Sequence, residues 1–425
     1  MKLSVPYGKE EVDFEVPEQN LMGVFGPKTV PGADDESKAI RNALLNPIGS
    51  KPLPEMAKGK SRVVIISTDV TRLTKDHLIV PLVLNVLAQA GVGEERIEVI
   101  VGVGQHREMT EQEVERKLGR EVLDRVTVMQ HNPDRNLVDL GTTRRGNRVL
   151  VNSEVARADL KISTGNIVPH GYAGFGGGAK SILPGVCGRE TIYRNHLYVV
   201  EGKSRPGVLE DNPIRGEIEE AAAMVGLNFV VNTVMNSEGR IVKVFAGHFL
   251  RAHREGARFA KDLLGVQMPS RAEVVVSSGS PMDINFYQAS KALEMGDSAV
   301  ADGGVYILAS PCYEGVGEKD LYRFLTLKLA EKILNELGQP KPSTNLVSGV
   351  VAYLMAKMRE RVEIVLFSGG LKREQVEAMG FKKADSVQAA VNESLEKKGK
   401  HSKVAVFPQG PITLPLPLDD SQILI

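Results

Sequence analysis

The chain has 425 residues, more than one hydrophobic core usually serves, so its length favours two domains. Its 53 basic and 53 acidic residues balance, which argues against a partner selected by bulk charge, such as DNA or an anionic membrane. Hydrophobic residues make up 42% and charged residues 25%, as in ordinary soluble globular proteins. The composition therefore favours a protein that acts on small molecules.

Cysteine usage and hydropathy predict a cytoplasmic protein. The two cysteines, Cys187 and Cys312, cannot build a disulfide framework, and their separation indicates no thiolate metal site. Residues 1–16 alternate like a β-hairpin and lack the apolar core of a signal peptide. The most apolar stretch, 77–91, is shorter than the roughly 20 residues that cross a bilayer, so we expect a buried helix there.

Short β-branched runs alternate with helical patterns along the first 264 residues. In chain order the pattern predicts a strand at 63–67, a helix near 78–90, a strand at 97–102, a helix opening at Thr110, strands at 126–129 and 159–165, a helix from about 188, strands at 227–234 and 241–245, and a helix at 249–264. Strands joined in this way by crossover helices are typical of an α/β fold with a parallel sheet.

A second cycle begins with a strand at 272 and continues with a helix at about 286–300 and strands at 304–309, 362–367 and 404–407. We therefore predict two Rossmann-like domains with mainly parallel sheets and an active site in the cleft between them. Residues 1–268 form the N-terminal cofactor-binding and catalytic domain, and 269–407 form a C-terminal domain that contributes substrate-binding residues. The Pro-rich tail, about 408–425, suits neither a central strand nor a helix and could pack back on the first domain.

Charged and polar residues follow several predicted strands, where the loops of parallel α/β sheets bind ligands. Asp69 and Arg72 follow the first strand, and Arg72 could bind a substrate carboxylate while Asp69 orients it. A surface ion pair at a helix entry is about equally consistent with this segment. His106 and His170 follow two other strands, and two imidazoles at such positions could flank one reacting carbon.

A glycine run, Gly174-Phe-Gly-Gly-Gly-Ala-Lys180, resembles a phosphate-binding loop because glycine amides and a lysine can hold anionic oxygens. Ala179 replaces the glycine that must precede the lysine, which makes nucleoside triphosphate binding a weak alternative. Gly176, Gly177 and Gly178 could instead let Lys180 approach a bound cofactor closely. A structural or solvent-exposed lysine is the other interpretation.

Two further candidates lie on predicted helices. His196 could bind a metal, although a lone helical histidine is more often structural. Tyr287 and Lys291 share one helical face with Gln288 at its flank, and together they could hold a hydroxy acid or carboxylate. A solvated helix face is the alternative for these three residues.

At these residues the chain resembles the nickel-dependent lactate racemase family. The matching segments occur in order and span both predicted domains: Asp69-Val-Thr-Arg72, Gly104-Gln-His106-Arg, Pro169-His170-Gly-Tyr-Ala-Gly-Phe-Gly-Gly-Gly-Ala-Lys180, Arg-Asn-His196 and Tyr287-Gln288-Ala-Ser-Lys291. Each segment alone is only weakly specific for this family. The glycine-rich segment from Pro169 to Lys180, combined with the other segments at compatible spacing, is specific.

The resemblance implies a nickel-pincer nucleotide, nickel pyridinium-3,5-bisthiocarboxylic acid mononucleotide, which cofactor-building enzymes would supply. Lys180 would be its covalent tether, beside Gly176, Gly177 and Gly178, and His196 would be the protein ligand to nickel. His106 and His170 would be the paired acid/base groups. The implied substrate-binding residues are Asp69, Arg72, Tyr287, Gln288 and Lys291.

The resemblance also implies the reaction, inversion at C2 of a 2-hydroxy acid through a 2-keto acid. One histidine would remove the hydroxyl proton as hydride passes to the cofactor, and the other would protonate the new alkoxide. Lactate is the representative substrate, and larger or more polar hydroxy acids remain open. The competing hypotheses are a phosphate-binding transferase or hydrolase that uses the glycine loop, and a non-catalytic hydroxy-acid-binding protein.

Overall fold

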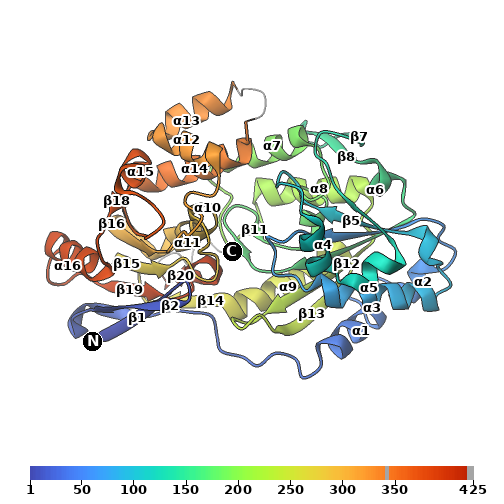
Figure 1. The fold of residues 1–425 in the computed structure, drawn as a ribbon, viewed down its shortest axis with the longest axis horizontal. Coiled ribbons are helices and arrows are strands. Elements are labelled where there is room, and N and C mark those ends of the chain that lie inside the picture. Colours follow the sequence, from blue (N-terminus) through green and yellow to red (C-terminus); the bar gives the residue numbers. More distant parts are fainter. Residues whose placement is uncertain (340–343, 419–425) are drawn as a thin grey trace. The chain divides into compact units, whose positions relative to one another are not determined.

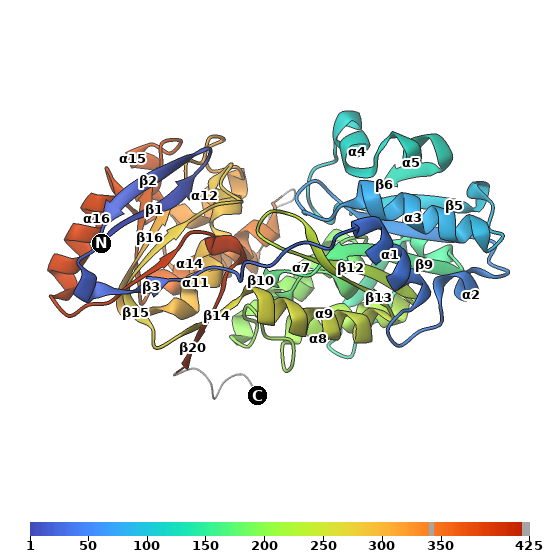
Figure 2. The same cartoon turned by 90° about the horizontal axis from the view of Figure 1, so that it is seen from below.

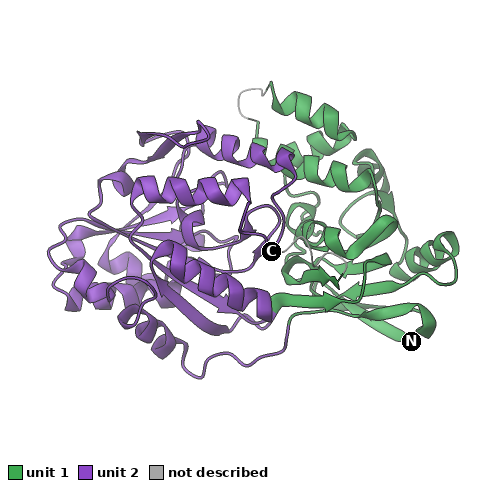
Figure 3. Cartoon of the chain, turned by 180° about the vertical axis from the view of Figure 1, so that it is seen from behind, with its two compact units in different colours: residues 1–27, 264–425 green, residues 28–263 purple. Residues whose placement is uncertain are grey.

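The structure is a computed structural model that describes residues 1–339 and 344–418. The chain forms two compact units, one of residues 28–263 and one of residues 1–27 with 264–425 (Figure 3). Each unit contains a six-stranded sheet, and helices connect most of the strands (Figure 1). The predicted α/β fold with two mainly parallel sheets is confirmed.

The sheet of residues 28–263 has the strand order β13-β12-β9-β4-β5-β6 and is parallel except for the β12–β13 pair. Its strands are β4 Val63–Thr68, β5 Ile97–Gly102, β6 Thr127–Gln130, β9 Leu160–Asn166, β12 Phe229–Met235 and β13 Ile241–Gly247. The central strands are apolar runs buried on both faces, as expected when helices cover both sides of a parallel sheet.

Short hairpins and helices complete this unit. The hairpins are β7 Leu137–Thr142 with β8 Arg148–Asn152, and β10 Pro169–His170 with β11 Gly174–Phe175. The helices are α1 Glu36–Leu45, α2 Leu53–Ala57, α3 Asp76–Gln89, α4 Glu111–Leu118, α5 Arg120–Arg125, α6 Ser153–Arg157, α7 Arg189–Leu197, α8 Pro213–Val225 and α9 Phe249–Leu264. In both described stretches of the chain, no helix is long and apolar enough to cross a membrane.

The second sheet has the order β18-β17-β16-β15-β19-β3, and all its neighbouring strands are parallel. Figure 2 labels three of these strands, β3, β15 and β16. Its strands are β3 Leu21–Val24, β15 Ala272–Ser278, β16 Val300–Ala309, β17 Glu363–Phe367, β18 Lys382–Lys383 and β19 Val404–Phe407. The helices of this unit are α10 Phe286–Ala289, α11 Lys291–Gly296, α12 Lys319–Thr326, α13 Ala330–Leu337, α14 Leu346–Arg359, α15 Arg373–Ala378 and α16 Val387–Lys398.

The first 27 residues belong to the unit of residues 264–425, which differs from the predicted division at 268. The hairpin of β1 Lys2–Tyr7 and β2 Glu10–Glu15 buries Val5 and Phe14 in the core that β15, β16, β17 and α16 form. Strand β3 then pairs with β19 at the sheet edge. The hairpin itself was predicted from alternation, whereas its packing partner depends on contacts with residues far along the chain.

The Pro-rich tail pairs with residues 265–268, which lie at the end of the predicted first domain. Strand β20 Leu414–Pro417 pairs in parallel with β14 Gly265–Met268, and both strands lie in the unit of residues 264–425. The tail thus forms a two-stranded ladder outside the central sheet, where proline is tolerated because one strand edge needs no N–H donor. Residues 419–425 of the predicted tail lie outside the described residues.

Candidate active site

Three adjacent parallel strands, β9, β4 and β5, bring predicted site residues to one edge of the sheet of residues 28–263. Asp69 comes directly after β4, His106 follows β5 by four residues, and His170 lies in the hairpin after β9. Because these strands run parallel, their carboxyl ends share one edge of the sheet. The sequence-based placement of these residues at strand ends is confirmed.

Asp69 and His106 form a hydrogen-bonded pair with Asp69 Oδ2 2.5 Å from His106 Nδ1. The Asp69 carboxylate also accepts from the amide and hydroxyl of Thr71, at 3.0 and 2.6 Å. Burial by itself would raise the pKa of Asp69, but the hydrogen bond and charge of His106, together with Arg72 and Thr71, lower it far below its usual range. An ionised Asp69 accepts the Nδ1 proton of His106, which leaves the Nε2 lone pair of His106 available as a base.

The loop from Thr68 to Asp76 is anchored by a buried polar network. Asp76 Oδ2 accepts from the Thr68 hydroxyl at 2.6 Å and lies 3.2 Å from Lys117 Nζ. Lys117 also donates to the carbonyls of Arg72 and Thr74, each at 2.8 Å. These contacts fix the backbone beside Asp69 and Arg72 to the interior of the unit. Buried polar groups stabilise a fold when their donors and acceptors are paired.

His170 lies in the hairpin of β10 and β11, where His170 pairs with Gly174. The Ala173 amide donates a long hydrogen bond of 3.5 Å to His170 Nδ1. The rings of His170 and Tyr172 meet edge to face with centroids 4.6 Å apart. The two candidate acid/base histidines thus have different partners, a carboxylate at His106 and a backbone amide at His170.

Tyr172 brings three of the predicted residues together. Its buried ring lies 4.6 Å from the ring of His170 and 5.0 Å from the ring of His196, and Lys180 Nζ is 5.7 Å from its centroid. A lysine ammonium within about 6 Å of a ring face is attracted by the ring quadrupole. Tyr172 lies within the Pro169–Lys180 motif, and no role was predicted for it.

His196 is buried on α7 and donates from Nδ1 to the Ile192 carbonyl at 2.8 Å. Burial, and then the nearby charge of Lys180, lower the pKa of His196 to about 3, against the opposing effect of the Ile192 hydrogen bond. The imidazole is consequently neutral at physiological pH. With its proton on Nδ1, it presents the Nε2 lone pair that metal ligation requires.

Backbone contacts join the His106 loop to the segment that follows Lys180. The Gly104 amide donates to the Gly185 carbonyl at 3.0 Å, and Gln105 Nε2 donates to the Arg189 carbonyl at 3.2 Å. The loop with the Asp69–His106 pair and the segment with Lys180 and His196 are therefore neighbours within one unit.

The glycine run is packed against protein atoms. A Cβ at Gly177 would lie 2.6 Å from Asn232 Oδ1, and one at Gly178 would lie 2.7 Å from the His253 ring. A Cβ at Gly176 would lie 2.9 Å from the Asn166 carbonyl. These glycines thus have a packing function, and their contact with a cofactor stays a prediction.

The segment that follows the run differs from a phosphate-binding loop, in which the glycine turn leads into the N-terminus of an α-helix. Lys180 lies in a short 3-10 helix, Gly178–Ser181. The next α-helix begins only at Arg189. This geometry does not favour the phosphate-binding alternative.

Tyr287, Gln288 and Lys291 lie in the other unit, after β15. The single helix predicted over about 286–300 is divided at Ser290 into α10 and α11, and a strand already begins at Val300. Lys291 Nζ donates a hydrogen bond of 2.5 Å to Gln288 Oε1, which joins the lysine ammonium to the side-chain amide three residues before it. These two groups are therefore held together, as a composite carboxylate-binding site would require.

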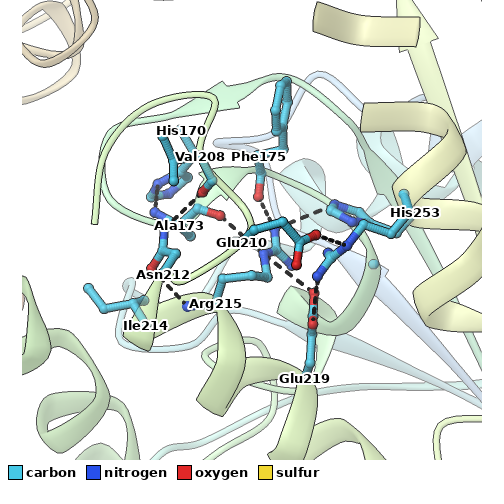
Figure 4. Close-up of polar contacts among 12 residues, drawn as sticks. His170, Ala173, Phe175, Val208, Glu210, Asn212, Ile214, Arg215, Glu219 and His253 are labelled. Carbon is cyan, nitrogen blue, oxygen red and sulfur yellow. Dashed lines mark hydrogen bonds and ion pairs between the residues drawn. The ribbon is translucent and has the colours of Figure 1, made fainter. Parts of the chain in front are cut away.

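Three further side chains surround the His170 hairpin and were not singled out from the sequence: Asn212, Arg215 and His253 (Figure 4). Arg215 and His253 are completely or almost completely buried, and a fully buried arginine is uncommon. Nothing in a single sequence distinguishes such an arginine from a surface one, because the amphipathic pattern of α8 tolerates either.

No group of three or more His, Cys, Asp or Glu side chains able to hold a metal ion occurs among residues 1–339 and 344–418.

The chain is similar to known proteins in family, sequence and structure. The family model described as the lactate racemase N-terminal domain matches residues 7–207, and that of the lactate racemase C-terminal domain matches residues 267–413. The lactate racemase of Thermoanaerobacterium thermosaccharolyticum is 31% identical over 416 residues, 96% of this chain and 97% of that protein. The lactate racemase of Lactiplantibacillus plantarum is 30% identical over 417 residues, 96% and 98% of the two chains.

Solved structures agree with this relationship. The lactate racemase apoprotein of T. thermosaccharolyticum superposes with a TM-score of 0.90 at 30% identity, covering 98% of this chain and all of that one. A protein from Thermotoga maritima shares the fold with a TM-score of 0.70 at 20% identity, covering 91% of this chain and all of that one. The relationships extend along almost the whole chain, and so this chain belongs to the lactate racemase family and is an isomerase of the racemase type.

Proposed function

We propose that the chain inverts C2 of a lactate-like 2-hydroxy acid and that His106 and His170 carry its acid/base chemistry. The observation that carries this proposal is the Asp69–His106 pair, at 2.5 Å, beside the segment that bears His170, Lys180 and His196. Relatives named lactate racemase align over 96% of the chain, which supports lactate as the first substrate to test.

In the proposed reaction His106 removes the substrate hydroxyl proton at Nε2, while its Nδ1 keeps its own proton in the hydrogen bond to Asp69. An ionised carboxylate beside the ring stabilises the imidazolium that forms. His170, in its protonated form, returns a proton from Nε2 to the oxygen of the mirror-image product. When His170 takes up a second proton at Nδ1, it loses the hydrogen bond that Nδ1 accepts from the Ala173 amide. Ala173 therefore influences how readily His170 acts.

The residues present fit the nickel-pincer nucleotide. His196 has a buried, neutral imidazole with Nε2 available, and Lys180 is held near it over Tyr172. Lys180 would form the covalent tether and His196 would be the single protein ligand to nickel. When bound, the cofactor supplies an acceptor for the C2 hydrogen with its electron pair, so that the hydroxy acid passes through a 2-keto acid.

We propose that Arg72, Tyr287, Gln288 and Lys291 bind the substrate. The guanidinium of Arg72 could hold the substrate carboxylate in a bidentate pair, while the joined Gln288 and Lys291 groups offer a second polar contact. Asp69 serves this network through His106. We further propose that the protein acts in the cytoplasm and that separate cofactor-building enzymes load it.

The test is intact mass and nickel content of protein produced together with the cofactor-building enzymes, followed by a chiral assay over a panel of 2-hydroxy acids. We expect one added cofactor mass, about one nickel per chain, and racemisation of lactate or a close analogue. Lys180→Ala should lose the added mass, whereas Lys203→Ala, a lysine outside the glycine run, should keep it. A Lys180→Ala chain that retains the mass contradicts the tether, and a loaded protein that racemises none of the panel contradicts the proposed reaction.

A further inference from the structure

Arg215 on α8 combines two features that rarely occur together. Its side chain is fully buried, and its closest carboxylate, Glu219, is 3.8 Å from Arg215 Nε. Glu219 instead binds Arg254 through two hydrogen bonds of 2.6 and 3.0 Å. Burial lowers the pKa of Arg215 to about 10. A buried charge whose ion pair is as long as 3.8 Å is costly for stability, so an apolar side chain would serve packing alone better.

The donors of Arg215 are directed at the loop that carries His170. Nε donates to the Ala173 carbonyl at 3.1 Å, and Nη2 donates to the Phe175 carbonyl (Figure 4). Hydrogen bonds from a charged donor in a buried site are stronger than those between neutral groups. Arg215 thus binds the backbone on both sides of Gly174.

Every carbonyl of residues 172–176 accepts a hydrogen bond from outside the loop. The donors, in order along the loop, are Asn212 Nδ2 at 2.9 Å, Arg215 Nε, the Gly207 amide at 2.9 Å, Arg215 Nη2, and His253 Nε2 at 2.8 Å. We call Asn212, Arg215 and His253 the loop clamp. A glycine-rich loop has a large conformational entropy when unfolded, and ordering its residues costs free energy. The loop clamp offsets this cost on the side of the loop that faces α8 and α9.

The loop clamp reaches His170 through a single peptide group. The carbonyl between Tyr172 and Ala173 accepts from Asn212, and the N–H of the same peptide donates to His170 Nδ1 (Figure 4). The neighbouring Ala173 carbonyl is the one that Arg215 holds. The position of the Ala173 amide, and with it the hydrogen-bonding state of the His170 ring, therefore depends on side chains that cannot themselves reach a substrate.

We propose that Arg215 is a positioning residue for this enzyme, which acts by fixing the 172–176 backbone so that the Ala173 amide, by donating to Nδ1, orients the neutral His170 ring before the ring is protonated and releases this amide. This assignment rests on the proposed acid/base function of His170. Arg215 makes no contact with the reacting atoms in this role. A displacement of about 1 Å in a catalytic group can reduce a rate about 10²-fold, so the effect of losing Arg215 should be large.

The variants are Arg215→Met, which keeps the length of the side chain and removes its donors, and Arg215→Lys, which keeps the charge with a single head group. Arg254→Met is the matched control, because Arg254 lies beside the loop clamp and binds Glu219 but no loop carbonyl. Turnover is measured per bound nickel in the loaded, full-length protein, and thermal unfolding is measured for each variant.

We expect Arg215→Met to lower kcat about 10²-fold with KM changed less than about threefold, and Arg215→Lys to recover part of the loss. Arg254→Met should lower the melting temperature without changing kcat. If Arg215→Met does not fold, Arg215→Lys carries the same comparison. If an Arg215 variant loses stability but keeps parental kcat per bound nickel, Arg215 is only a structural residue and the proposal is wrong.

A second readout does not depend on catalysis. In full-length protein with 15N-labelled histidine, the tautomer of the His170 ring, assigned through His170→Gln, should be the Nε2-protonated form in the parent and in Arg254→Met, and a mixture in Arg215→Met. An unchanged His170 tautomer in Arg215→Met overturns the proposal. If the parent protein racemises no hydroxy acid, the proposed function fails, and this measurement still decides whether Arg215 positions His170.

Discussion

At the scale of single residues, the two candidate acid/base histidines are not equivalent. His106 donates to a buried carboxylate, and His170 accepts from a backbone amide at 3.5 Å. We expect Asp69→Asn to lower kcat by roughly 10²- to 10⁴-fold, because the variant no longer stabilises protonated His106. Steady-state kinetics of the nickel-loaded protein test this. Glu113→Gln, which removes a surface carboxylate paired with Arg107, is the matched control and should keep parental kcat. Equal activity of both variants contradicts a role for Asp69.

The same carboxylate predicts how stability depends on pH. The folded-state pKa of Asp69 is lowered, so its contribution is fully present above the unfolded pKa of about 3.9 and is lost as pH falls through the folded value. The difference in free energy of unfolding between the parent and Asp69→Asn should therefore be greatest near pH 7 and shrink below about pH 4. Urea unfolding from pH 7 to pH 3 measures this difference. If the difference in free energy of unfolding between the parent and Asp69→Asn grows as the pH falls, the prediction is wrong.

Sequence reasoning placed Asp69, His106 and His170 at strand ends because a β-branched run followed by polar residues is a local signal. It could not pair Asp69 with His106, since 37 residues separate them. Arg215 was not found for the same reason. Arg215 acts through the backbone carbonyls of residues 173 and 175, and the amino-acid sequence does not show where backbone carbonyls lie.

At the scale of elements, the β10–β11 hairpin needs glycine at 174 for two separable reasons. Gly174 has a φ of +71°, and a Cβ there would lie 2.1 Å from the Val208 carbonyl oxygen. Gly202 has the same φ of +71° with nothing within 4 Å of a Cβ. Gly202→Ala should thus cost only the backbone strain, about 1–2 kcal/mol, and Gly174→Ala about 3 kcal/mol or more. Urea unfolding of both variants separates the cost of backbone strain from the cost of the clash with the Val208 carbonyl. Equal losses of stability in the two variants would contradict that clash.

Elements were predictable to different degrees. Helix α9 begins and ends at the predicted residues, because its apolar residues recur with helical spacing and no proline interrupts them. The helix expected over 286–300 is instead two short helices, because Asn285 caps the first and the chain turns at Ser290, whose hydroxyl donates to the Tyr287 carbonyl at 2.9 Å. The periodicity of the side chains alone does not show this interruption.

At the scale of the whole molecule, the first 27 residues complete the unit of residues 264–425. Phe14 is buried in that core, whereas Val24 on β3 is about half exposed. We expect Phe14→Ala to destabilise this unit by about 3–5 kcal/mol, because it leaves a cavity among apolar side chains, and Val24→Ala to change stability little. Hydrogen exchange measured by mass spectrometry resolves the effect by segment.

The expected pattern is faster exchange in β15, β16 and β19 of Phe14→Ala, with the amides of β4 and β5 unchanged. Those two strands belong to the core of residues 28–263, which Phe14 does not enter. A division of the chain at residue 268 would place Phe14 with β4 and β5 and so predicts the opposite pattern. Loss of protection in β4 and β5 with β15 unaffected would therefore favour that division, because a cavity weakens the unit whose core contains it.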